Sequence, residues 1–308
     1  MLNSIVALIA TLKNVAGKEL DEFLASIENQ TLRPNIVVLT DGSSTDSTVD
    51  SLKKFAETST LNIQVRVVPG NRSIGRNEAI FTAIEELGSK NIIIACTNLC
   101  VLDPQWLETI TSPIRRGAAD LVGGFWLIPT RNPSESAMAL LTQWTKPEEV
   151  VFPSALSMAF TVQVWDSIGG FPEELDTSED TEFVHRLRQS GLGFKEVFTK
   201  DAVVYWRPKT LTIDDAAKTY YQFAVTDAKA KLMSRQYAAT FMAYALPLFV
   251  TVVIPWLGVL MLFGWFGFRI RKVLRNRWLL SKIPYTIYAA FSIDFARMMG
   301  YMRGRGQR

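Results

Sequence analysis

The stretch Asn35-Ile-Val-Val-Leu-Thr40 runs directly into Asp41-Gly-Ser-Ser-Thr-Asp46. Its first part is an apolar run of strand length, which predicts a buried strand. Its second part is rich in Asp, Gly, Ser and Thr, the residues that form turns. Together they predict a strand that ends in a polar loop.

The same alternation continues on both sides of this stretch. Apolar runs of strand length indicate three more strands, at 4–10, 63–68 and 91–96. Apolar residues at helical spacing lie between them and predict helices over 20–27, 49–55 and 73–86. Strands that alternate with helices predict an α/β fold with a mostly parallel sheet and right-handed crossovers.

Ligands of such sheets bind outside the carboxyl ends of the strands. We therefore expect residues 11–14, 41–46 and 97–103 to share one rim. The chain has no G-x-G-x-x-G and no Walker A sequence, which argues against a dinucleotide or P-loop site.

After residue 119 the order of elements changes. Strands are expected at 120–126, 159–164 and 202–206. Helices are expected at 134–144, 165–171, 178–190 and 213–233. The chain therefore divides into an α/β domain over residues 1–230 and a different region over 231–308.

Charge separates these two regions. The net charge is +3, but residues 231–308 hold 12 Lys and Arg and one acid, Asp294, so the rest of the chain carries −8. A basic, apolar tail suits anionic lipid head groups. We expect no nucleic-acid partner, because the tail contains long apolar runs that need burying.

The tail has an apolar part, a basic part and an amphipathic part, at 241–268, 269–282 and 283–300. The apolar part has 28 residues, enough to cross a bilayer at about 20 residues per crossing. Pro255 and Gly258 interrupt it. Both flanks are basic, which favours keeping both in the cytoplasm.

Three arrangements of the tail remain open. The first is a re-entrant hairpin bent at Pro255, and the second is a crossing that returns through 278–300. The third is a single crossing. We expect the α/β domain on the cytoplasmic side, because Cys96 and Cys100 are the only cysteines and residues 1–10 do not resemble a signal peptide.

Three more motifs follow the opening stretch along the chain. They are Gly75-Arg76-Asn77-Glu78-Ala79-Ile80, Gly169-Gly170-Phe171 and Ser178-Glu179-Asp180 with Arg186-Leu187 behind it. In this order the motifs resemble the family-two glycosyltransferases. The resemblance runs from Ile5 to about Ala230, and it implies the GT-A fold, a Rossmann-like domain with a mostly parallel sheet.

The resemblance implies a site for a nucleotide-diphosphate sugar. Asp41 would accept from the base and Arg76 would bind the diphosphate, for which a guanidinium is well suited. The other expected nucleotide-sugar residues are Thr11, Thr97, Asn98 and Leu99. From the residues alone, an ordinary capped turn at Asp41 and a solvated arginine at position 76 stay open.

The resemblance also implies a catalytic pair and an acceptor side. Asp180 matches the family's catalytic base, with Glu179 beside it; a positioned carboxylate can deprotonate an acceptor hydroxyl. A capped, salt-bridged helix is the other interpretation of these acids. The expected acceptor-side residues are Trp165, Gly169, Gly170, Trp206 and Arg207.

The metal ligands typical of the family are missing. Relatives hold Mg²⁺ or Mn²⁺ with Asp-x-Asp after the fourth strand, where this chain has Thr97-Asn98-Leu99. They often have a histidine where this chain has Trp206. We therefore assign no metal ligand, and both weak binding of Mg²⁺ or Mn²⁺ and a site without metal stay open. Without metal, Arg76, Arg207 or Lys209 could neutralise the diphosphate.

The sequence thus predicts an inverting glycosyltransferase that uses a nucleotide-diphosphate sugar and a hydroxyl acceptor, lipid-linked or on a glycan, at a membrane. One alternative is a polyprenyl-phosphate sugar synthase, whose phosphate acceptor needs no general base. The other is an inactive, membrane-bound protein that binds sugar nucleotides.

Overall fold

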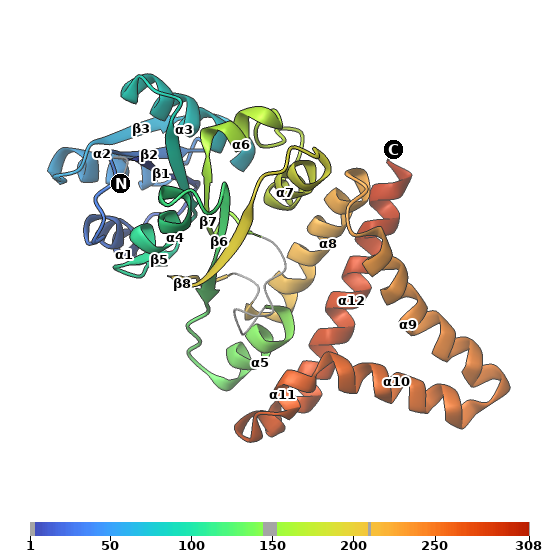
Figure 1. Cartoon of the computed structure of the whole chain (residues 1–308). Coiled ribbons are helices and arrows are strands. Elements are labelled where there is room, and N and C mark those ends of the chain that lie inside the picture. The colour runs from blue at the N-terminus through green and yellow to red at the C-terminus, as the bar shows by residue number, and fades with distance from the viewer. Residues whose placement is uncertain (1–3, 144–152, 209–210, 308) are drawn as a thin grey trace. The chain divides into compact units, whose positions relative to one another are not determined.

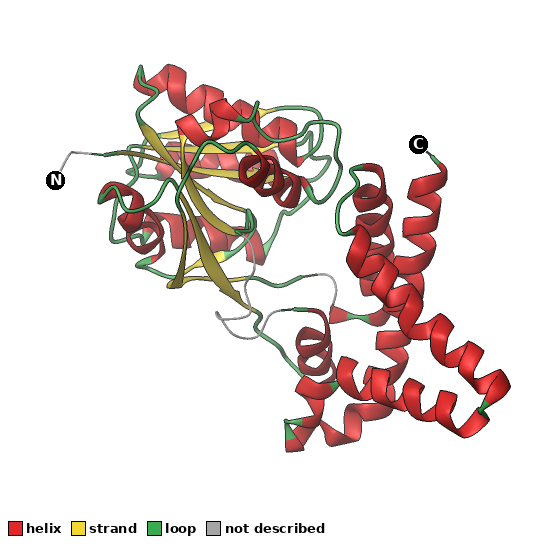
Figure 2. Cartoon of the chain, turned by 45° about the vertical axis from the view of Figure 1, so that its right-hand side comes forward, coloured by secondary structure: helices red, strands yellow, loops and turns green. Residues whose placement is uncertain are grey.

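The computed structural model describes residues 4–143, 153–208 and 211–307. The chain forms two compact units. The sheet unit comprises Met1–Leu127 and Lys146–Arg207, and the helical unit comprises Ile128–Thr145 and Pro208–Arg308. Figures 1 and 2 show the sheet in the first unit and only helices in the second.

One eight-stranded sheet organises the sheet unit, in the order β3-β2-β1-β4-β7-β6-β8-β5. Six strands point the same way, and only β7 and β5 run against them. The expected mostly parallel sheet is confirmed. The strands are β1 Ile5–Leu12, β2 Ile36–Asp41, β3 Ile63–Val67, β4 Ile92–Thr97, β5 Val101–Leu102, β6 Leu121–Leu127, β7 Ser157–Thr161 and β8 Glu196–Tyr205.

Helices cover the sheet because its central strands are apolar on both faces. Alternate residues of β1, β2 and β4 form a buried cluster with α3, α6 and α7. On β6, β7 and β8 the packing helix is α4. The helices of this unit are α1 Lys18–Glu28, α2 Thr48–Thr58, α3 Arg72–Leu87, α4 Trp106–Arg115, α6 Val162–Ser167 and α7 Glu179–Gln189.

The expected elements are present, with shifted boundaries. The strand expected to reach residue 164 stops at Thr161, whose side chain accepts from the N–H of Val164 and so caps α6. The last strand is longer than expected and begins at Glu196. Two-residue β5 was not expected, because so short a run shows no periodicity.

Strand register brings the predicted rim together. Leu12 pairs with Asp41, Ala10 with Thr97, and Thr97 with Ser157. The ends of β1, β2 and β4 therefore lie beside the start of antiparallel β7. The chain just before β7 consequently reaches the same edge of the sheet.

The helical unit contains α5 and all helices after residue 210. Its longest helix, α12 Ile283–Gly306, packs along α8 Ile213–Lys229. The helices approach closely because Gly300 and Gly304 lie against carbonyl oxygens of α8. The others are α5 Pro133–Thr142, α9 Ser234–Val253, α10 Pro255–Arg269, α11 Arg271–Leu274 and the 3-10 helix η3 Arg277–Lys282. This division differs from the boundary expected at residue 230, because α8 packs with the tail.

The apolar part of the tail forms two helices, not one. Ile254 leaves the helical conformation (φ −134°, ψ 85°), and Pro255 starts α10. Figure 1 shows α9 and α10 converging on this point. Among the described residues, one helix, α9, is long and apolar enough to cross a membrane, which by itself is weak evidence for a crossing.

Candidate functional site

The first turn of α7 carries the two predicted catalytic acids. Ser178, just before the helix, has a left-handed backbone conformation (φ 60°). Glu179 and Asp180 are the first two residues of α7. Acids in a first turn are favoured by the helix dipole, and Arg186 and Arg188 occupy the last turn. The two carboxylates bind different partners, Arg76 for Glu179 and Ser154 for Asp180.

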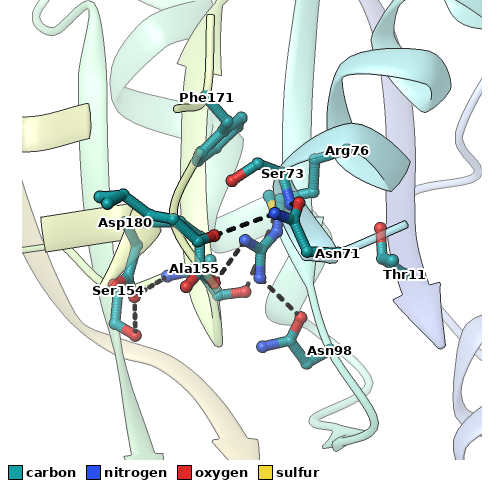
Figure 3. Close-up of polar contacts among 12 residues, drawn as sticks. Thr11, Asn71, Ser73, Arg76, Asn98, Ser154, Ala155, Phe171 and Asp180 are labelled. Atoms are coloured by element: carbon teal, nitrogen blue, oxygen red, sulfur yellow. Dashed lines mark hydrogen bonds and ion pairs between the residues drawn. The ribbon is translucent and has the colours of Figure 1, made fainter. Parts of the chain in front are cut away.

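Glu179 is buried in an ion pair with Arg76 of α3. Its Oε1 lies 2.6 Å from Nη1 of Arg76, and the exposed fractions of the two side chains are 5% and 0%. Nη2 of Arg76 donates to Oδ1 of Asn98 at 3.0 Å (Figure 3). The guanidinium also lies over the ring of Phe171, 5.3 Å from its centroid. Arg76 therefore joins the end of β4 to the start of α7.

This pair keeps its charges despite burial. Burial alone would raise the pKa of Glu179, but Arg76 and then Arg72 lower it below its ordinary value. Burial would lower the pKa of Arg76, but the Glu179 carboxylate raises it above its ordinary value. Glu179 consequently places a permanent negative charge beside Asp180.

Asp180 is half-buried and is held by the segment before β7. Its Oδ2 accepts from the hydroxyl of Ser154 at 2.8 Å and from the backbone N–H of Ala155 at 3.1 Å (Figure 3). Burial first, and the charge of Glu179 second, raise the pKa of Asp180 above its ordinary value. A fixed carboxylate with raised basicity is suited to accept a proton.

The Arg76 guanidinium is not exposed to a phosphate in solvent. It has no exposed surface, and its charge is matched by Glu179. The contact with a diphosphate therefore stays a prediction. The predicted contact requires an accessible guanidinium, since arginine is rarely buried without a partner. The sequence does not reveal the partner, because Glu179 lies 103 positions after Arg76.

Arg72 is an exposed arginine that the sequence analysis did not select. It is the first residue of α3, at the same edge of the sheet, and its charge lowers the pKa of Glu179. Guanidinium groups at a helix N-terminus are suited to phosphate. The signal was its position four residues before Arg76, at the start of the predicted helix.

The end of β2 forms a closed turn. Asp41 has no exposed surface, and its carboxylate accepts from the backbone N–H of Ser44 at 2.7 Å and from the Ser44 hydroxyl. The Thr11 and Thr40 hydroxyls bond to each other at 2.8 Å. Gly75 packs onto both, and a Cβ there would come within 2.5 Å of Thr11. The predicted contacts of Thr11 and Asp41 with a nucleotide stay predictions.

The residues after β4 do not fit a divalent cation. The hydroxyl of Thr97 donates to the Leu156 carbonyl at 2.9 Å, and Asn98 already accepts from the Arg76 guanidinium. Leu99 offers no oxygen in its side chain. Mg²⁺ prefers carboxylate oxygens, and a neighbouring guanidinium repels it. In residues 4–143, 153–208 and 211–307 there is no group of three His, Cys, Asp or Glu that could hold a metal ion.

Two of the expected acceptor-side residues have structural roles in the core. Trp165 is 6% exposed, and its indole N–H donates to Oδ1 of Asn77 at 2.9 Å. The same oxygen accepts from the N–H of Phe171 at 2.9 Å. A Cβ on Gly170 (φ +78°) would meet both Asn77 and Trp165. Both residues therefore help to hold the core together, and their contacts with an acceptor stay predictions.

The remaining acceptor-side residues lie outside that network. Gly169 adopts φ +76° with open space around it, which fits a turn. Trp206 is half-buried at the end of β8 and donates its backbone N–H to Leu127. Arg207 follows it and is half-buried too. Contacts of these residues with an acceptor stay predictions.

Comparison with known families identifies a match over the first half of the chain. Residues 7–164, slightly more than half of the chain, match the family described as glycosyl transferase family 2. The O-antigen chain rhamnosyltransferase WbaN of Salmonella anatum is 24% identical over 313 residues, which cover 97% of this chain and 88% of that protein.

Solved structures share the fold. TarS 1-349 from S. aureus superposes with a TM-score of 0.52 at 15% identity, covering 99% of this chain and 92% of that chain. TarS 1-349 in complex with UDP-GlcNAc gives the same values. At this identity the likeness concerns the fold alone, and it confirms the GT-A-like architecture expected from the sequence.

Proposed function

The chain belongs to glycosyl transferase family 2, and we propose that it is an inverting enzyme that transfers a sugar from a nucleotide diphosphate to the hydroxyl of a lipid-linked acceptor. One observation carries the inverting mechanism. Asp180 is fixed at the carboxyl edge of the sheet by Ser154 and Ala155, with its pKa raised.

In the proposed reaction the acceptor oxygen attacks the anomeric carbon from the face opposite the diphosphate. The new C–O bond forms as the bond to the diphosphate breaks, and the leaving group takes that electron pair. Asp180 receives the hydroxyl proton. Attack from the opposite face inverts the anomeric configuration. Glu179 keeps Asp180 basic, and Arg76 keeps Glu179 charged and in place.

We propose activated rhamnose as the first donor to examine. The support is the similarity to a protein described as an O-antigen chain rhamnosyltransferase, which extends over both units of this chain. The structures of TarS in complex with UDP and UDP-GlcNAc support a nucleotide diphosphate as the activating group.

We further propose that cationic side chains of this chain stabilise the leaving diphosphate. Arg72 is the first candidate for this contact, because it is exposed at the start of α3. Arg207, two residues after the end of β8, is a second, and Lys209 lies outside the described residues. The residues at the end of β4 do not supply the carboxylates for Mg²⁺ or Mn²⁺, so the proposed reaction uses no metal there.

The acceptor is proposed to be lipid-linked because the chain has the features of a membrane-attached protein. Its helical unit exposes a group of large apolar side chains beside basic residues. We propose that the sheet unit lies on the cytoplasmic side, since basic segments tend to stay there.

The test is transfer into a lipid phase. Protein reconstituted in lipid is incubated with labelled nucleotide sugars, rhamnose first, and a crude bacterial lipid extract. We expect label in the lipid phase, in a glycosidic bond whose anomeric configuration, measured by NMR, is opposite to that of the donor.

Three outcomes would contradict the proposal. Label attached directly to a lipid phosphate would indicate a polyprenyl-phosphate sugar synthase. Retained configuration would overturn the inverting mechanism. Nucleotide binding without transfer from any donor would indicate an inactive binding protein.

A further inference from the structure

The apolar tail forms a hairpin whose two arms are fastened at one residue. In the part of the chain that the structure describes, Asp294 of α12 is 1% exposed. Its Oδ2 accepts from the Tyr244 hydroxyl of α9 at 3.1 Å. It also binds Arg269 of α10 through two bonds, at 3.0 and 2.8 Å. Both arms of the hairpin therefore leave α12 from the same place.

The arms are packed against each other near the bend. Gly258 of α10 lies so close to α9 that a Cβ would come within 2.0 Å of the Thr251 hydroxyl oxygen and 2.5 Å of the Pro247 carbonyl. Ile254 and Pro255 form the bend itself. The close packing of the two arms therefore holds the bend of the hairpin in one conformation.

Helix lengths limit how far this apex extends from Asp294. Tyr244 to Val253 is half of α9 and rises about 14 Å, and α10, from Pro255 to Arg269, rises about 21 Å. The hydrocarbon core of a bilayer is about 30 Å thick. The shorter arm limits the distance between Asp294 and the apex. The apex therefore extends roughly as far as the middle of a bilayer and not through it.

The surface beyond Asp294 is apolar and exposed. Phe249, Val252, Trp256 and Phe263 are 70%, 84%, 66% and 70% exposed. No Asp, Glu, Lys or Arg occurs from Gln236 to Phe268. A contiguous exposed surface of this kind marks an interaction site.

Basic side chains flank the hairpin at both of its ends in the sequence. Arg235 lies at the start of α9, and Arg271, Arg275 and Arg277 follow α10, all exposed. Trp278, 60% exposed, lies among them, and tryptophan prefers the interface between lipid and water. An apolar apex between two basic flanks matches the change from acyl chain to phosphate in one leaflet.

We propose that the α9–α10 hairpin enters one leaflet of an anionic bilayer and returns to the side from which it came, so that neither helix crosses. This inference rests on the membrane attachment proposed above, but not on sugar transfer. It selects the re-entrant arrangement from the three that the sequence left open.

Vesicle flotation tests the partner. Wild type should float with vesicles of phosphatidylglycerol and phosphatidylcholine, and binding should weaken at least tenfold in Phe249→Glu/Val252→Glu. The matched control is Leu192→Glu, at an apolar residue of the sheet unit that is 55% exposed. All three proteins should unfold at the same temperature in detergent, because the changed side chains are exposed.

Labelling from each side of the bilayer tests the one-leaflet geometry. The variants are Arg235→Cys, Arg271→Cys and Val252→Cys; the native cysteines are buried. An impermeant maleimide is applied to sealed right-side-out and inside-out vesicles. The two flanking cysteines should react from the same side, and the apex cysteine from neither side until detergent is added.

The outcomes separate the possible failures. Wild type that does not bind vesicles, or that buries the apex in a stable dimer, would overturn the lipid partner. Bound protein whose apex cysteine reacts from the far side, or whose flanks react from opposite sides, would overturn the one-leaflet geometry and leave attachment intact.

Discussion

The site on the sheet unit and the hairpin of the helical unit depart from ordinary burial in opposite directions. At the first, Arg76 and Glu179 are charged and almost fully buried. At the second, Phe249 and Val252 are apolar and more than two thirds exposed. Charges are rarely buried unless paired, and large apolar surfaces are rarely exposed on monomers.

The difference shows what each region is organised to do. A buried ion pair contributes little net stability, since desolvation offsets its attraction. The pair here instead sets the charge next to Asp180. The exposed apolar apex likewise contributes little to folding in water, and we have proposed a lipid leaflet as its partner. On these proposals chemistry and attachment are separable, and the predictions below test this separation.

The largest expected effect is on the proton acceptor. Asp180→Asn should lower kcat about 10²- to 10⁴-fold, because the amide cannot take the acceptor proton. Transfer is measured with the lipid acceptor. Asp176→Asn, an exposed carboxyl of the preceding loop, is the matched control and should retain wild-type rates. An Asp180→Asn enzyme with near-normal kcat would mean that the acceptor needs no base.

The next effect concerns the buried pair. Arg76→Met should lower the free energy of unfolding by about 3–5 kcal/mol, because it leaves Glu179 buried without its partner. Lys90→Met breaks an exposed pair with Asp166, whose side chains are 69% and 58% exposed, and should cost no more than about 1 kcal/mol. Urea titration of both variants measures the contrast. Equal decreases in the free energy of unfolding would show that burial does not make the Arg76–Glu179 pair more sensitive than an exposed pair.

The sequence predicted the elements of the sheet unit because their patterns are local. Apolar runs marked β1, β2 and β4, and the motif at 178–180 marked the start of α7. Partners separated by many residues could not be predicted in this way. Ser154 binds Asp180 across 26 positions, and no spacing rule connects them.

Two burials depend on partners that are distant in the sequence. The indole of Trp165, predicted on the acceptor side, binds Asn77, 88 positions earlier, within the core. Arg76, predicted to contact a diphosphate, is buried against the carboxylate of Glu179, 103 positions later. In the tail, Pro255 correctly indicated the bend, but only Asp294 shows where the arms are fastened.

A smaller effect is expected on pH dependence. The Asp180 carboxylate must be ionised to act, so kcat/KM should fall as pH drops through its raised pKa. The Ser154 hydroxyl donates to the ionised form. Ser154→Ala should raise the pKa further and move the acid limb to higher pH. The control is Ser190→Ala at the C-terminal cap of α7, which should leave the pH profile unchanged. A limb that moves to lower pH would contradict the assignment.

The smallest effect is expected on metal removal. The end of β4 presents a hydroxyl, an amide that accepts from Arg76, and a leucine. Transfer should therefore change less than about twofold on addition of EDTA, because these groups bind divalent cations poorly. Loss of transfer that Mg²⁺ or Mn²⁺ restores would show that cations bind elsewhere in the chain.

One measurement tests the separation of chemistry from attachment most directly. Initial rates are compared for wild type, Asp180→Asn and Phe249→Glu/Val252→Glu, with the acceptor in vesicles and with a water-soluble acceptor of the same sugar. Asp180→Asn should lose transfer to both, whereas the hairpin variant should lose transfer only to vesicles. A hairpin variant that fails equally with both acceptors would contradict the account.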